Sequence, residues 1–197
     1  MTDRPPDRPL PIIRGEHVYL RPPERTDIPT FVRWFDDAEV THDLAFRAPL
    51  SIPLEEQWFD GMLAAQGKTD YSFVICLRAD DRPIGTIGLH GLDFVNGTAD
   101  FGIAIGEKDE QNRGNGTDAL RALCDFGFGE LRLERIGCDV YAGNDRAMRC
   151  YQKAGFAREG TRRHAHFSRG AYLDVHVMGL LRTDWAADPR PKSWERD

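Results

Sequence analysis

A polar loop with two glycines separates an apolar strand from an amphipathic helix near the middle of the chain. The strand ends in Ile103-Ala104-Ile105, and the loop closes on Gly114-Asn115-Gly116 where the helix begins. Glycine lets a backbone approach a ligand closely. The first amides of a helix have no intrahelical partner and favour an anion. The segment therefore predicts a site for an anionic ligand, although a turn that merely starts a helix would use the same glycines.

Two common phosphate-binding motifs do not fit this loop. Gly114 to Ala119 has the G-x-G-x-x-A form of a dinucleotide fingerprint, but that fingerprint follows its strand directly and here residues 107–113 intervene. The chain also has no room for a second mononucleotide-binding half. No Gly-Lys-Ser/Thr closes the loop as in a P-loop. We therefore do not expect an oxidoreductase that binds a dinucleotide.

Length and composition indicate one globular domain. The chain has 197 residues, of which 41% are hydrophobic and 29% charged, close to the average for globular proteins. No apolar run approaches the roughly 20 residues that span a bilayer, and the start is too rich in proline and mixed charge for a secretory signal. Four separated cysteines fit reduced thiols. We therefore expect a soluble, cytoplasmic protein with no membrane segment.

The formal net charge of −6 comes from 26 basic and 32 acidic residues. A negative surface opposes binding to the phosphate backbone of nucleic acid. It also concentrates small cations near the protein. We therefore expect no nucleic-acid partner and a mild preference for a cationic small molecule.

Polar, proline-rich segments flank the predicted domain. Residues 1–11 are interpreted as a mobile tail, and residues 186–197 as a second tail whose Trp194 is loose or docks on the body or on a partner. Strands and helices are interleaved across residues 12–185, which predicts an α/β fold with a mixed sheet. Strands are expected at residues 17–21, 71–77, 84–90, 98–105 and 135–141 and on both sides of 168–170; helices are expected at 28–35, after 51, and at 116–129 and 144–154.

Two motifs in this region resemble the signatures of the GNAT superfamily of acyl-CoA-dependent N-acyltransferases. Gln111-Asn112-Arg113-Gly114-Asn115-Gly116 matches the Q/R-x-x-G-x-G/A loop that binds the CoA pyrophosphate. Asn144-x-x-Ala147-x-x-x-Tyr151-x-Lys153-x-Gly155-Phe156 matches the second signature in the family order. The resemblance implies a single-domain GNAT-like fold. Its mixed, mostly antiparallel sheet would have six to seven strands, about four flanking helices and a V-shaped splay between the central strands.

Further segments resemble the branch of ribosomal-protein N-terminal acetyltransferases and bacterial polyamine acetyltransferases. They are Leu20-Arg21-Pro22 with Asp27, Trp34 with Asp37, Glu39 and Val40, and Glu159-Gly160 with Arg163 and Asp174. The resemblance implies transfer of acetyl, or another short acyl group, from acyl-CoA to a protein N-terminus or to a small cationic amine such as a polyamine or aminoglycoside. Homodimers are common in this branch. A non-catalytic acyl-CoA sensor or interaction module on the same fold is the alternative.

The resemblance also implies which residues contact acyl-CoA. The pyrophosphate loop matches Gln111, Arg113, Gly114, Asn115, Gly116 and Thr117. Ile103, Ala104 and Ile105 match the strand whose backbone pairs with the pantetheine arm. Asn144 matches a residue near the pantetheine, and its place directly before a helix also fits an N-cap.

Catalytic roles follow from the same comparison. Tyr151 matches a tyrosine near the CoA sulfur, where a phenol can protonate the leaving thiolate, although core packing would also explain it. An amine with a pKa of about 10 is only about 0.1% neutral at pH 7, so a base is expected. Asp139 matches a glutamate base of protein N-terminal members, Asp100 matches an acidic position on the preceding strand, and His90 has a pKa suited to the role. A water chain is the remaining option.

Two other features of the late strands affect the substrate and metal predictions. Arg162, Arg163 and Arg169 would repel a polyamine from that rim, or alternatively bind a CoA phosphate or an acidic acceptor. His164 and His166 would share one face of a strand, but no third ligand accompanies them. We therefore expect no metal.

Overall fold

The computed structural model describes residues 13–44 and 49–196, so the predicted mobile tail at residues 1–11 lies outside the described part. Eight strands form one sheet in the order β1-β2-β3-β4-β5-β6-β8-β7. The strands are β1 (Ile13–Arg14), β2 (Val18–Arg21), β3 (Tyr71–Leu77), β4 (Pro83–Asp93), β5 (Thr98–Ile105), β6 (Arg135–Tyr141), β7 (Ala157–Ser168) and β8 (Ala171–Leu181). The α/β fold is as expected. The sheet has one strand more than the upper expectation because the two-residue β1 pairs with β2.

The α-helices are α1 (Ile28–Phe35), α2 (Ile52–Ala65), α3 (Asn115–Asp125), α4 (Asp145–Lys153) and α5 (Arg182–Ala187). Shorter helical turns are η1 (Arg25–Asp27), η2 (Lys108–Glu110), η3 (Phe126–Glu130) and η4 (Ser193–Glu195). Local signals start two helices as expected: the Ser51 hydroxyl accepts from the Leu54 amide at 3.4 Å, and Asn144 Oδ1 accepts from the Ala147 amide at 3.0 Å.

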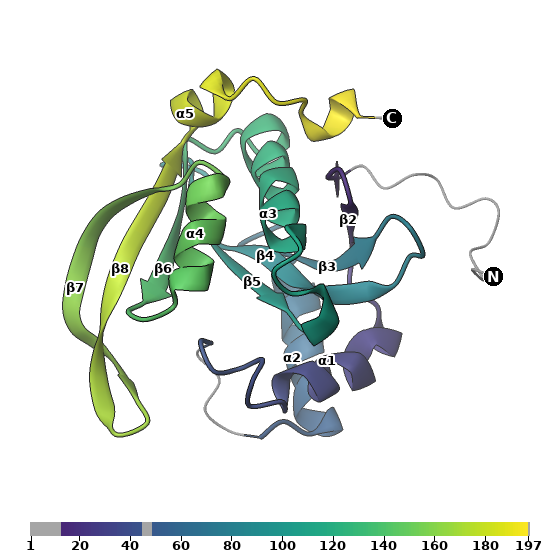
Figure 1. Cartoon of the computed structure of the whole chain (residues 1–197). Helices are drawn as coiled ribbons and strands as arrows, with labels where there is room; N and C mark the ends of the chain where they lie inside the picture. Colours follow the sequence, from purple (N-terminus) through teal and green to yellow (C-terminus); the bar gives the residue numbers. More distant parts are fainter. Residues whose placement is uncertain (1–12, 45–48, 197) are drawn as a thin grey trace.

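Helices cover both faces of the sheet. Phe73 and Ile75 of β3 belong to the main core cluster together with residues of α3 and α4, and these two helices lie in front of the central strands in Figure 1. The alternate residues Val74 and Cys76 pack instead with Trp34 of α1. A strand that is covered on both faces is mostly apolar, which explains the apolar run from Phe73 to Leu77 in β3.

The sheet divides where its only parallel pair separates, as far as the described residues show. Pairing between β5 and β6 joins Thr98 to Arg135, Ala99 to Ile136 and Asp100 to Gly137, and no later residues of the two strands pair. Neighbouring strands are antiparallel elsewhere in the sheet. The splay confirms the V-shaped opening that the resemblance implied.

Two of the branch motifs fix helix α1. The Arg21 guanidinium donates two hydrogen bonds of 2.7 Å to the buried Asp27 carboxylate, immediately before α1. The indole of Trp34 donates to Glu107 at 2.9 Å, in the connection that follows β5. These motif residues therefore attach α1 to β2 and to the connection after β5, which both belong to the β1–β5 part of the sheet.

The C-terminal segment differs from the loose tail suggested by its composition. Asp125, at the end of α3, is 1% exposed. Its carboxylate accepts hydrogen bonds from Trp185 Nε1 at 2.8 Å, from the Arg190 guanidinium at 2.6 Å and from the Ser193 amide at 2.8 Å. A buried carboxylate requires such partners. Residues 186–196 therefore lie against α3 (Figure 1), and Trp194 packs over Gly129.

Replacing Asp125 with Asn should lower the free energy of unfolding by about 3 kcal/mol, because Arg190 would remain buried without its counter-charge. Urea denaturation followed by circular dichroism measures this change. Asp60→Asn is the matched control: its 2.6 Å pair with Arg25 is more than half exposed on both sides, so the expected loss is below about 1 kcal/mol. Equal losses in the two variants would contradict the prediction.

Candidate active site

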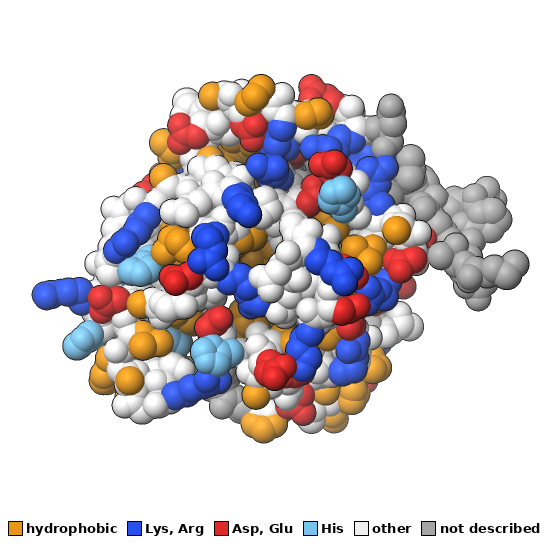
Figure 2. Space-filling model, viewed as in Figure 1, with side chains coloured by type: hydrophobic (Ala, Val, Ile, Leu, Met, Phe, Trp, Pro, Cys, Tyr) orange, Lys and Arg blue, Asp and Glu red, His pale blue; other side chains and the backbone are white. Residues whose placement is uncertain are grey.

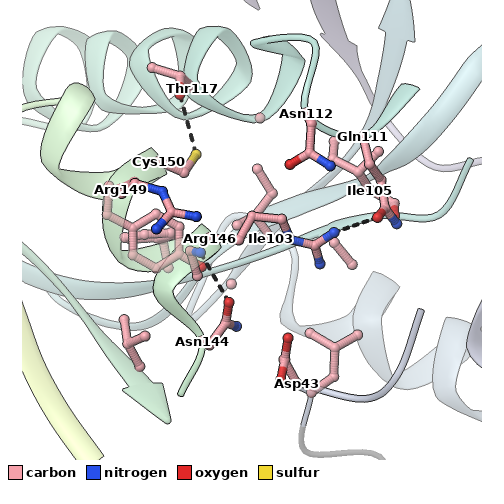
Figure 3. A pocket seen from close by; sticks show the side chains of 18 of the residues that line it. Asp43, Ile103, Ile105, Gln111, Asn112, Thr117, Asn144, Arg146, Arg149 and Cys150 are labelled. Atoms are coloured by element: carbon pink, nitrogen blue, oxygen red, sulfur yellow. Dashed lines mark hydrogen bonds between the residues drawn. The ribbon is translucent and has the colours of Figure 1, made fainter. Parts of the chain in front are cut away.

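A cavity of about 360 Å³ occupies the V between β5 and β6. Its floor is residues 101–105 of β5 and residues 139–141 of β6, and its walls are α4, the start of α3 and residues 40–44 after α1 (Figure 3). Ten of the residues predicted from the sequence line it: Ile103, Ala104, Ile105, Gln111, Gly114, Gly116, Thr117, Asp139, Asn144 and Tyr151. The fold therefore brings both signature motifs to one cavity.

The glycine loop is held from behind by a buried acid. Gly114 has φ +89° and Asn112 has φ +61°, a left-handed conformation that glycine and asparagine tolerate best. Glu110 lies under the loop, where its carboxylate accepts from Arg82 at 2.6 Å and from Asn115 Nδ2 at 3.0 Å. The Asn115 side chain thus supports the loop and does not line the cavity.

Arg113 also lies outside the cavity lining. Its guanidinium is 3.5 Å from Glu110, and its side chain is 61% exposed. Gln111, by contrast, bridges two walls: its Nε2 donates to the Ile105 carbonyl at 2.9 Å, and its Oε1 accepts from Arg146 of α4. This glutamine therefore connects the loop to both β5 and α4.

Three cations of α4 line the cavity and were not singled out from the sequence. They are Arg146, Arg149 and Lys153, spaced so that one helix face presents them all. Figure 2 shows Lys and Arg side chains around the hollow on this face of the molecule. The spacing was visible in the second motif, but nothing local indicated that this face of α4 borders a cavity. With the free amides at the start of α3, these cations suit a polyanion.

Tyr151 projects from α4 into the apolar end of the cavity. Its side chain is 9% exposed and meets Phe101 of β5 edge to face, with ring centroids 4.9 Å apart. Burial raises the pKa of Tyr151 far above its usual value. The hydroxyl therefore stays protonated and is suited to donate a proton.

The three candidate bases lie on the other face of the sheet. Asp139 lines the cavity where β6 diverges, and its carboxylate is paired with Arg162 of β7. Asp100 lies outside the lining, and its carboxylate leans over Gly137. His90 is opposite Asp100 across the β4–β5 ladder. The three bases predicted from the sequence therefore share one face of the sheet. The sequence did not show that each of them has a different neighbouring side chain.

The two histidines of β7 do not share a face. The register shifts between Arg162 and His166, and His164 adopts φ +50° within that irregularity. His166 stacks on Tyr141 with ring centroids 3.7 Å apart, whereas His164 lies by Tyr172, which faces the opposite side. Within residues 13–44 and 49–196, no group of three or more His, Cys, Asp or Glu side chains could hold a metal ion.

No helix in the described part of the chain is long and apolar enough to cross a membrane. The exposed apolar side chains of the longest helix, α2, are Ile52, Leu54, Trp58 and Leu63. They alternate with charged residues such as Glu56 and Asp60. Like the helices around the cavity, α2 therefore has a mixed surface.

Comparison with known proteins gives a consistent result. A family model described as an acetyltransferase (GNAT) domain matches residues 17–157. The uncharacterized N-acetyltransferase p20 of Bacillus licheniformis is 27% identical over 173 residues, covering 87% of this chain and 96% of that protein. Spermidine N(1)-acetyltransferase of Escherichia coli strain K12 is 28% identical over 172 residues, covering 87% of this chain and 89% of that protein.

The fold also matches solved structures. A crystal structure of spermidine N-acetyltransferase from Vibrio cholerae in complex with CoA and spermine gives a TM-score of 0.80 at 22% identity, covering 87% of this chain and 99% of that one. The family model spans most of this chain and includes both signature motifs and the two splayed strands. The chain therefore belongs to the GNAT family of acetyltransferases.

Proposed function

We propose that this protein transfers the acetyl group of acetyl-CoA to a primary amine of a small polycation of the spermidine type. The observation that carries the proposal is the cavity in the V between β5 and β6, which joins a cationic end to an end where the buried Tyr151 stays protonated. Acyl-CoA has a polyanionic end and a thioester end, and the two ends of the cavity are suited to hold them.

The residues of the cavity fit acetyl-CoA as the donor. Loop amides from Gly114 to Thr117 and the α4 cations would bind its phosphates. The edge of β5 from Phe101 to Ile105 is unpaired on its β6 side, which leaves backbone groups for the amide-containing arm. When bound, acetyl-CoA supplies the activated thioester.

Within this cavity, the chain contributes mainly positioning and one proton donor. Holding the donor and the amine together makes their reaction effectively intramolecular. An amide of the splayed strand would stabilise the charge that develops on the carbonyl oxygen. Tyr151, kept neutral by burial, would protonate the departing sulfur.

Charge on the sheet face opposite α3 and α4 supports a cationic acceptor. Asp70 and Asp100 lie on that face, and Asp43 lines the adjoining cavity wall. The charge of Arg162 is balanced by its pair with Asp139, which weakens the repulsion expected at this rim. Two of the relatives are named as spermidine acetyltransferases. Together with the net charge of −6, these observations favour a polyamine over a peptide N-terminus.

Release of the CoA thiol tests the function. The purified protein is mixed with acetyl-CoA or succinyl-CoA and with spermidine, spermine, an aminoglycoside, lysine or short peptides. Saturable turnover with acetyl-CoA and a polyamine is the expected result. Preference for peptides would overturn the proposed acceptor, and CoA binding without turnover on any amine would favour a sensor.

Tyr151→Phe should lower kcat by about tenfold or more, because the thiolate would leave without a proton donor. The dissociation constant for CoA, measured by isothermal titration calorimetry, should stay within about twofold. Tyr172→Phe is the matched control, since Tyr172 is 62% exposed on the β7–β8 hairpin. An unchanged kcat in Tyr151→Phe would remove the proposed acid.

Arg149→Gln should weaken CoA binding by about tenfold, because a charge-assisted hydrogen bond contributes roughly 1.5–3 kcal/mol. The loss should shrink as salt screens the interaction. Arg158→Gln, on β7 and outside the cavity lining, is the control for charge alone. A Kd unaffected by the Arg149 substitution at low salt would exclude the α4 cations from phosphate binding.

A further inference from the structure

Three ionisable side chains form one row across β3, β4 and β5. His90 pairs with Asp100 in the β4–β5 register. Because Tyr71 pairs with Leu89, Asp70 comes opposite His90 on the other side. The Asp70 carboxylate is 3.2 Å from His90 Nδ1 and also accepts from the Gly91 amide at 3.3 Å. The imidazole is therefore flanked by two carboxylates and contacts one of them.

The contact with Asp70 fixes the orientation and the tautomer of His90. Burial raises the pKa of Asp70, but hydrogen bonds from Thr69 and His90 outweigh burial and hold this pKa below its usual value. An ionised carboxylate only accepts hydrogen bonds, so Nδ1 of the imidazole carries a proton. Nε2 is then left with a free lone pair, which can accept a proton.

Two glycines make room for the imidazole over β4 and β5. A Cβ at Gly88 would lie 3.2 Å from Cε1 of His90, and one at Gly102 would lie 3.4 Å from Nε2. Gly102 itself lines the acetyl-CoA cavity. The Nε2 atom of His90 therefore lies over the strand residue that borders the cavity, on the face opposite Tyr151.

This position coincides with the apex of the V. Pairing between β5 and β6 stops at Asp100, and Gly102 is two residues beyond it. Phe101, between them, contacts Tyr151 on the other face. A base at Nε2 and an acid at the Tyr151 hydroxyl would thus flank the same short stretch of β5.

We propose that His90 is the general base of the reaction and that Asp70 is its positioning residue, forming a carboxylate–imidazole dyad on the acceptor face. This inference rests on the proposed function. Nε2 takes one proton from the acceptor ammonium, and the freed nitrogen lone pair forms the bond to the thioester carbonyl carbon. As the C–S bond breaks, the sulfur takes the Tyr151 proton, and the second proton lost by the nitrogen restores the phenol. One proton in total passes from His90 to solvent.

The other two acids are engaged differently. Asp139 is paired with Arg162. Asp100 leans toward β6, where its charge acts on Arg135, and Arg135 is itself paired with Glu159. Asp70 and Asp100 are thus the charged groups that flank His90 along its row, and both would stabilise the imidazolium and attract a cationic acceptor.

The test compares rates across pH. His90→Gln should lower kcat/KM for spermidine by about a hundredfold at pH 7, with the Kd for CoA unchanged. The deficit should shrink as the pH approaches about 10, where the amine deprotonates in solution. A purely structural role would give a loss that does not depend on pH. Asp70→Asn should give a smaller, similarly pH-dependent loss of about tenfold.

The matched control is His17→Gln, because His17 also lies beside an acid, Glu16, at 3.9 Å but at the β1–β2 turn. Its activity should equal that of the wild type. Wild-type activity in His90→Gln at pH 7 would overturn the dyad and leave the proposed function standing. A pH-dependent loss of activity in Asp139→Asn or Asp100→Asn, and not in His90→Gln, would have the same consequence. Absence of turnover by the wild type with every amine would refute both the dyad and the proposed function.

Discussion

The early end of the pairing between β5 and β6 is the constraint on which the rest of the structure depends. Strand edges present backbone groups that must find partners. On β5 one of them, the Ile105 carbonyl, accepts from the Gln111 side chain, which in turn contacts Arg146 of α4. The remaining edge borders the cavity. A complete parallel pair would leave neither a cavity nor a passage between the two faces of the sheet.

An opening in the centre of a sheet removes hydrogen bonds between strands, so other contacts must hold the surrounding elements in place. Helix α3 makes such contacts at both of its ends. Asp118, in its first turn, accepts from the backbone amides of Glu16, His17 and Val18 at 2.8, 2.8 and 3.1 Å. Asp125 at its other end binds the C-terminal segment. The helix whose N-terminus would bind phosphate is therefore fixed at both ends by carboxylates. Fixed amides cost little reorganisation when an anion binds.

The sequence predicted correctly those features that depend on interactions between residues close together in the chain. Ser51 and Asn144 cap helices through bonds within three residues, and the glycine loop adopts left-handed backbone at Gly114. It failed where the partner is distant in the chain. The composition of residues 186–196 is that of a tail, and only the buried Asp125, more than 60 positions earlier, turns it into part of the domain.

The same distinction explains what the sequence showed of the site. The resemblance predicted ten of the residues that line the cavity, since a family motif carries positions whose neighbours are already known from the family. The α4 cations and the contact between Asp70 and His90 depend on which elements meet. Cross-strand register, which brings Asp70 opposite His90, is set by the β3–β4 ladder as a whole. No short pattern around either residue encodes it.

The proposed division of acid and base between two faces of one sheet follows from what each group must do. The proposed proton donor, Tyr151, must stay neutral, and its burial against Phe101 and Phe156 keeps the hydroxyl protonated. The base must exchange protons with water after each turnover, which a half-exposed His90 can do. One environment could not meet both demands. A sheet that opens at a single point allows the two groups to differ in exposure while they flank the same residues of β5.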